Sequence, residues 1–172
     1  TFSYGYFQAS IVLFMPAYAI EVKGMSESDT ILAPAFFAAG MLLFSNYAAR
    51  LGDRFGHLFM MRILGLVGLG AIVILLPSQG SIALFILIFV AGASLASVSP
   101  VSLALQGLVV APRDMSRAGG LYNASYALGM LIGPRISAEI YARYGGSAMI
   151  AQFGVLWAAF ILVTIVFRKD DP

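Results

Sequence analysis

The chain of 172 residues contains no cysteine and a single histidine, and only 10% of its residues are charged. Without cysteine there is no disulfide and no thiolate metal site, and one imidazole cannot form a histidine cluster. No carboxylate or histidine lies near the middle of a long apolar stretch, and no Ser-His-Asp set or carboxylate pair stands out. The sequence therefore predicts no enzyme activity, no metal site and no cofactor.

Apolar residues, by contrast, make up 60% of the chain, against about 45–50% in a soluble domain. A helix needs about 20 apolar residues to cross the hydrocarbon core of a bilayer. Six stretches of about that length follow one another: Phe2–Ile20, Ile31–Ala49, Leu58–Pro77, Ser81–Val110, Gly119–Tyr141 and Ala148–Phe167. Because strand-type alternation is absent, we predict an all-α integral membrane protein, a bundle of six transmembrane helices surrounded by lipid.

The connections between these stretches are short, which predicts one domain over residues 1–172. Two three-helix repeats, 1–77 and 81–167, are indicated by prolines at the same place in their first helices, Pro16 and Pro100. Three helices reverse the direction of the chain, so such repeats would be inverted relative to each other. The fourth stretch is longer than a bilayer requires and is expected to tilt, kink or project.

Basic residues predict the orientation in the membrane. Seven lie beside one end of the predicted bundle: Arg50, Arg54, Arg62, Arg113, Arg117, Arg168 and Lys169. Only Lys23 and Arg143 lie beside the other end, with Arg135 just inside its edge. Basic residues favour the cytoplasmic side, so we predict that both termini are cytoplasmic. The net charge of +2 is explained in this way, and no nucleic-acid partner is expected. The compact loops favour a bacterial inner (plasma) membrane.

Polar side chains within the apolar stretches predict which surfaces turn away from lipid. We predict that a small-molecule substrate contacts Tyr4, Gln8, Asn46, Gln106, Asn123 and Tyr126. The third and sixth stretches carry few polar residues and are expected to form a scaffold that faces lipid. Small and hydroxyl residues also mediate dry helix packing, as the spacing of Gly129 and Gly133 would allow. Glu139 precedes Arg143 by four residues, which predicts an ion pair on one helix face.

One charged segment interrupts the apolar stretches. It reads Ala49-Arg-Leu-Gly-Asp-Arg-Phe-Gly-His57 and is followed by Arg62. Gly52 and Gly56 would permit a tight turn between antiparallel helices. Asp53 can accept hydrogen bonds from a helix N-terminus or pair with an arginine.

This segment resembles the signature loop of the major facilitator superfamily, Gly-x-Leu-Ala-Asp-Arg-x-Gly-Arg/Lys, with Ala49 and His57 as departures. Residues 117–134 resemble the start of that family's eleventh helix, and residues 4–18 resemble its seventh. The resemblance covers essentially the whole chain and implies a secondary active transporter of small solutes that works by alternating access. It also implies a cytoplasmic gating loop, to which we assign Arg50, Gly52, Asp53, Arg54, Gly56, Arg62 and Arg117.

The relaxed form of the loop resembles the second half of such a transporter. We therefore expect the chain to be part of a longer protein and its main partner to be a missing N-terminal six-helix half. Two alternatives remain: a complete six-helix protein acting as a homodimeric channel or carrier, and a membrane scaffold or receptor that transports nothing. Among transporters, both efflux of apolar compounds and uptake of a metabolite fit the residues.

Overall fold

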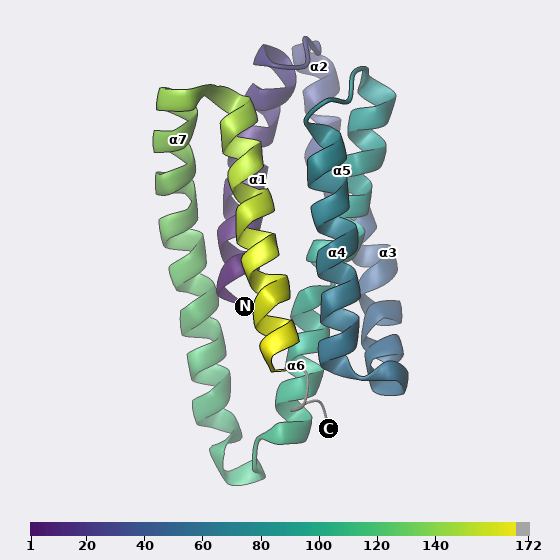
Figure 1. The fold of residues 1–172 in the computed structure, drawn as a ribbon, viewed down its shortest axis with the longest axis vertical. Helices are drawn as coiled ribbons and strands as arrows, with labels where there is room; N and C mark the ends of the chain where they lie inside the picture. Colours follow the sequence, from purple (N-terminus) through teal and green to yellow (C-terminus); the bar gives the residue numbers. More distant parts are fainter. Residues whose placement is uncertain (168–172) are drawn as a thin grey trace.

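The computed structural model describes residues 1–167, so Arg168 and Lys169, used above for the orientation, lie outside the described residues. Over this range every regular element is a helix, which confirms the predicted all-α class (Figure 1). In chain order the elements are α1 (Phe2–Glu21), α2 (Glu27–Thr30), α3 (Leu32–Phe55), α4 (His57–Leu75), α5 (Ser81–Leu95), α6 (Val98–Val109), the short 3-10 helix η1 (Pro112–Asp114) and α7 (Met115–Val166).

Four helical stretches among residues 1–167 are long and apolar enough to cross a membrane: Glu27–Phe55, His57–Leu75, Ser81–Val109 and Pro112–Val166. The last of these cannot be one straight rod, because the 52 residues of α7 would extend about 78 Å. It folds back at Gly145, whose φ of 81° is readily adopted only by glycine. Two antiparallel arms result, which we call the first arm (115–144) and the second arm (146–166) (Figure 1).

The predicted fourth stretch is broken into α5 and α6. The break falls at Ala96 and Ser97, three to four residues before Pro100. Proline has no N–H to donate, and its ring crowds the carbonyl four residues earlier, which here belongs to Ala96. The Ser99 amide bonds that carbonyl instead, at 3.2 Å, in a tighter turn. This stretch was expected to tilt, kink or project; its helix breaks here, and Pro100 explains the position of the break.

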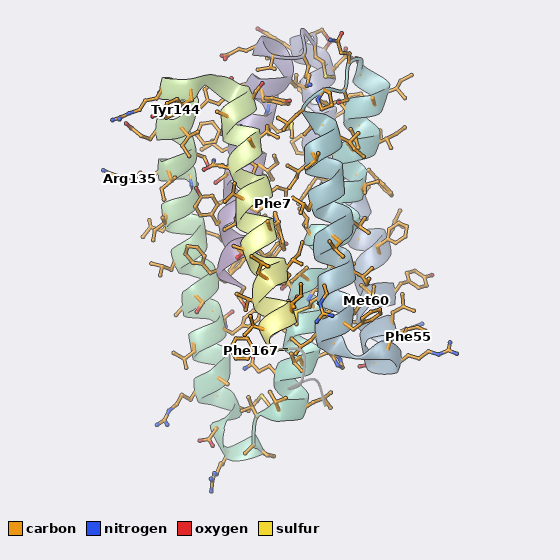
Figure 2. All side chains as sticks on the ribbon, viewed as in Figure 1. Phe7, Phe55, Met60, Arg135, Tyr144 and Phe167 are labelled. Carbon is orange, nitrogen blue, oxygen red and sulfur yellow. The ribbon has the colours of Figure 1, made fainter. Side chains whose placement is uncertain are left out.

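Aromatic rings fill the centre of the bundle. Phe7 of α1, labelled in Figure 2, is 1% exposed. Its ring makes edge contacts with two rings of the second arm of α7, Phe153 at 5.2 Å and Trp157 at 6.0 Å between centroids. Trp157 is fully buried. The second arm thus exposes residues such as Val155, but its bulkiest side chain points inward, which the prediction of a lipid-facing scaffold did not anticipate.

Glycines allow two pairs of helices to approach backbone to backbone. Where α3 crosses α5, a Cβ atom on Gly40 would collide with the Phe89 carbonyl oxygen, and one on Gly92 with that of Phe37. Where α1 crosses the first arm of α7, a Cβ on Gly129 would collide with the Phe2 carbonyl oxygen. Small residues at crossings are how membrane helices reach close van der Waals contact without a hydrophobic driving force.

The end of the bundle that carries the Gly145 turn also carries α2 (Figure 1). There Lys23 donates from Nζ to the carbonyl oxygens of Leu76 and Ser78, at 2.9 and 2.7 Å. Burial lowers the pKa of Lys23. A cation at these carbonyls satisfies groups that the end of α4 leaves without helical partners. The lysine therefore ties the loop after α1 to the end of α4.

Candidate functional site

Three of the six residues predicted to contact substrate come together. The Tyr126 hydroxyl on the first arm of α7 donates to Gln8 Oε1 on α1 at 2.5 Å. The Tyr4 ring stacks on that of Tyr126, with centroids 5.7 Å apart and planes 28° apart. The Tyr4 hydroxyl reaches Met41 Sδ on α3 at 3.8 Å. Gly5 makes this cluster possible, because a Cβ there would collide with the Tyr126 carbonyl oxygen.

A second polar contact, one helical turn away, joins the first arm to α6. The Tyr122 hydroxyl lies 2.8 Å from Ser99 Oγ and 3.2 Å from Ser102 Oγ, and it also donates to the Ser99 carbonyl oxygen at 3.2 Å. Tyr122 was not among the residues predicted to contact substrate. Its position four residues before Tyr126, on the same helix face, is the signal that would have found it.

The other three predicted substrate residues do not join this cluster. Asn46 on α3 and Asn123 on the first arm are exposed, and Gln106 on α6 is half-buried. Within residues 1–167 none of the three forms a side-chain hydrogen bond. Asn123 lies about 160° around the arm from Leu121, which is 65% exposed, so this arm presents one polar and one apolar outer face.

A further polar network lies inside the bundle, in a place where the sequence predicted none. The Tyr6 hydroxyl donates to Gln152 Oε1 at 2.9 Å, and Gln152 Nε2 donates to Ser137 Oγ at 2.7 Å. These side chains belong to α1, the second arm and the first arm, so the network links three helices. Since Ser137 is fully buried, Gln152 turns into the bundle and away from lipid.

A small cavity of about 20 Å³ lies inside the bundle. It is lined only by apolar side chains from α1, α3, α4, α5 and α7, among them Met15, Phe37 and Ile150. This volume would hold about one water molecule, and an apolar lining gives that water no partner. This cavity is therefore too small and too apolar to hold a polar solute.

The predicted gating loop is mostly helix. Residues 50–55 form the last turns of α3, and only Gly56, with φ 99° and ψ 136°, makes the turn into α4. Gly52 does not form the turn, which corrects the expectation. It is buried, and a Cβ there would lie 3.2 Å from His57 Cδ2 and 3.4 Å from Val101 Cγ1 on α6. The Asp53 carboxylate lies 3.2 Å from His57 Nε2 and is itself largely exposed.

The arginines assigned to gating lie in different places. Arg50 and Arg54 are exposed on α3, and Arg117 is exposed on the first arm. Arg62 turns the other way, because its Nη2 donates to the Thr164 carbonyl oxygen at 2.8 Å near the end of α7. A cation is favourable at the C-terminal end of a helix, so Arg62 stabilises the second arm. This contact joins residues 102 positions apart, which sequence reasoning could not reach.

Near the Gly145 turn, Arg143 Nε pairs with Glu139 Oε1 at 2.5 Å, as the spacing predicted. No group of three or more histidine, aspartate or glutamate side chains within residues 1–167 is placed to hold a metal ion.

A family model described as Major Facilitator Superfamily matches residues 1–172. The chain belongs to the Major Facilitator Superfamily. An uncharacterized MFS-type transporter of Yersinia pseudotuberculosis is 25% identical over 168 residues, which are 97% of this chain and 42% of that protein. The uncharacterized MFS-type transporter YcaD of Salmonella arizonae is 26% identical over 164 residues, 95% of this chain and 42% of that protein. This chain thus spans about two fifths of the length of these curated relatives, and it belongs to a family of transporters rather than enzymes.

Proposed function

We propose that this chain is the C-terminal six-helix half of a secondary active transporter that moves a small solute across the membrane by alternating access. Its coverage of 42% of each relative supports a missing N-terminal half as its partner. The cluster of Tyr4, Gln8 and Tyr126, beside a cavity that is small and apolar, supports passage of the solute along the flank of the bundle. In this proposal the flank faces the other half, and residues 1–77 and 81–167 are the two inverted repeats within one domain.

The proposed solute site is built around Tyr4, Gln8 and Tyr126, with Asn123 exposed on the same arm and Asn46 and Gln106 nearer the Gly56 end. Amides and hydroxyls are costly against lipid, so an exposed Asn123 favours a water-filled path. These groups carry no net charge. They therefore suit an uncharged or amphipathic solute, whether it is taken up or expelled.

The gate, in the same proposal, is the end of the bundle around the Gly56 turn, with Arg50, Arg54 and Arg117 facing the partner half. Gly52 packs against both His57 and Val101, so the Gly56 turn and α6 would move together. Replacing Asp53 by Asn removes the charge beside His57 and is expected to shift the balance between inward- and outward-open states without impairing insertion. Site-directed labelling from both sides of the membrane would measure this balance. If the Asp53→Asn variant and the parent were labelled equally from each side, the proposed gate would be contradicted.

We place the protein in a bacterial inner membrane, with the Gly56 turn and both termini of the chain in the cytoplasm. Helical spans suit the inner membrane, since outer-membrane proteins are typically barrels. The similar transporters of Yersinia and Salmonella are bacterial, which supports this assignment. The excess of basic residues near the Gly56 end supports the orientation.

The decisive experiment compares the two outer faces of the first arm. This chain has no cysteine, so Asn123→Cys and Leu121→Cys each introduce a thiol that is unique within it. In membrane vesicles a water-soluble maleimide is expected to label the first variant at least about tenfold faster than the second, because only one face lines a water path. Equal and slow labelling of both thiols would remove the proposed pathway and favour a protein that transports nothing.

A further inference from the structure

Arg135 lies on an exposed face of α7 that is apolar toward the start of the first arm and carries Glu139 about one turn further on. It is exposed and projects from the first arm away from the other helices (Figure 2). Leu128 and Leu131, which share this stripe within about 60° of arc, are 50% and 75% exposed. The stripe therefore runs from apolar to cationic along the helix axis, toward the Gly145 turn.

The nearby carboxylates are already engaged. Glu139, four residues further along, is paired with Arg143. Glu21 accepts a hydrogen bond from the Tyr141 hydroxyl, which lies about 120° around the arm from Arg135. Within residues 1–167 no ion pair or hydrogen bond reaches Arg135. The three charges of this stretch, two arginines and one glutamate, sum to one unbalanced positive charge.

The depth of Arg135 makes a missing partner costly. Tyr144 is 72% exposed, and tyrosines gather at membrane–water interfaces. Arg135 lies nine residues before it, about 13 Å deeper along the axis. Helical side chains lean toward the helix N-terminus, which for this arm is away from the Gly145 turn. To reach water, the Arg135 side chain must therefore bend toward the Gly145 turn, opposite to the direction in which helical side chains lean.

We propose that Arg135 binds the phosphodiester of an anionic phospholipid, such as phosphatidylglycerol, whose acyl chains lie along Leu128 and Leu131. A phospholipid has the matching shape: its phosphate meets the guanidinium where the long arginine side chain bends back toward the boundary, and its acyl chains run deeper, parallel to the arm. The planar guanidinium can hold two phosphate oxygens at once, and the unbalanced positive charge favours a lipid with net negative charge. The site depends on insertion in a membrane but not on transport or on which leaflet it faces.

The test measures how tightly the detergent-purified protein retains added phosphatidylglycerol, by native mass spectrometry. Arg135→Gln is expected to weaken binding of that lipid about tenfold or more, the effect of losing a charge-assisted pair of hydrogen bonds. Arg135→Lys keeps the charge but cannot donate two parallel hydrogen bonds to one phosphate, so an intermediate loss of lipid affinity is expected. Arg113→Gln, an equal loss of charge at the exposed η1 turn, serves as the control and should bind like the parent.

Two further measurements keep the site falsifiable. A galactolipid with the same acyl chains but no phosphate should bind weakly, and its binding should not change with Arg135→Gln. Equal retention of phosphatidylglycerol by Arg135→Gln and the parent would overturn the proposal. If Arg135→Gln then also lowered the melting temperature in lipid-free detergent, the counter-ion would be a protein carboxylate elsewhere in the polypeptide.

Discussion

Two crossings in this bundle use the same packing device with opposite chemistry. Where α3 meets α5, Gly40 and Gly92 bring the backbones together, and phenylalanine rings surround them, including a stacked pair 4.8 Å apart between Phe36 and Phe85. Where α1 meets the first arm of α7, Gly5 and Gly129 do the same, but tyrosine, glutamine and serine side chains surround them. One crossing is dry and the other is polar.

In the proposed function, the polar crossing is the one that serves the solute. Packing alone explains the dry crossing, since rings and close backbones are enough to hold helices in a membrane. The polar crossing gains little extra stability from its hydrogen bonds, which average about 0.6 kcal/mol each between membrane helices. Keeping tyrosines and amides in hydrocarbon therefore needs another reason, and contact with a polar solute supplies one.

The largest expected effect is common to both crossings. Gly40→Val and Gly129→Val each force a branched side chain into a facing backbone, and each is expected to destabilise the protein by about 3 kcal/mol. Thermal unfolding in detergent measures the loss. Gly70→Val is the control, since a Cβ there has no neighbour within 4 Å. If only one crossing proved sensitive, the two would not be equivalent supports of the fold.

The next effect should occur at the polar crossing and should not be additive. Gln152→Leu leaves the Tyr6 and Ser137 hydroxyls without their partner in a buried place and is expected to cost about 2 kcal/mol. Removing both hydroxyls as well, with Tyr6→Phe and Ser137→Ala, should cost less than the three single changes added together. Chemical or thermal unfolding of all four variants checks this. Strict additivity would mean that the three side chains do not act as a network.

Sequence patterns predicted the helices well and their contacts poorly. Length and hydropathy located the helical stretches, the excess length of the fourth predicted that it would tilt, kink or project, and spacing predicted the pair of Glu139 and Arg143. All of these depend on neighbours along one helix. The pairing of Tyr126 with Gln8 could not be predicted, because it joins residues 118 positions apart and depends on how two helices cross.

The charged segment shows the same limit. Its glycines predicted a turn, yet only Gly56 has the positive φ of a turn, whereas Gly52 is buried in α3. A glycine required by a bend and a glycine required by a close neighbour look identical in sequence. The neighbours of Gly52, His57 and Val101, come from α4 and α6, so only the packed bundle identifies its role.

The change with the smallest expected effect on stability, Tyr126→Phe, distinguishes the two crossings most clearly. Tyr126→Phe keeps the ring stacked on Tyr4 and removes only the hydroxyl bonded to Gln8, so a loss of about 0.6 kcal/mol is expected. Solute transport should nevertheless fall severalfold in reconstituted vesicles, because Gln8 loses the group that orients its amide.

The matched change in the dry crossing, Phe44→Leu, removes an edge contact with Phe89 at 6.0 Å. It should cost about 1 kcal/mol of stability and leave transport near the parent level. Equal transport losses in the two variants would mean that the polar crossing holds helices together just as the dry one does.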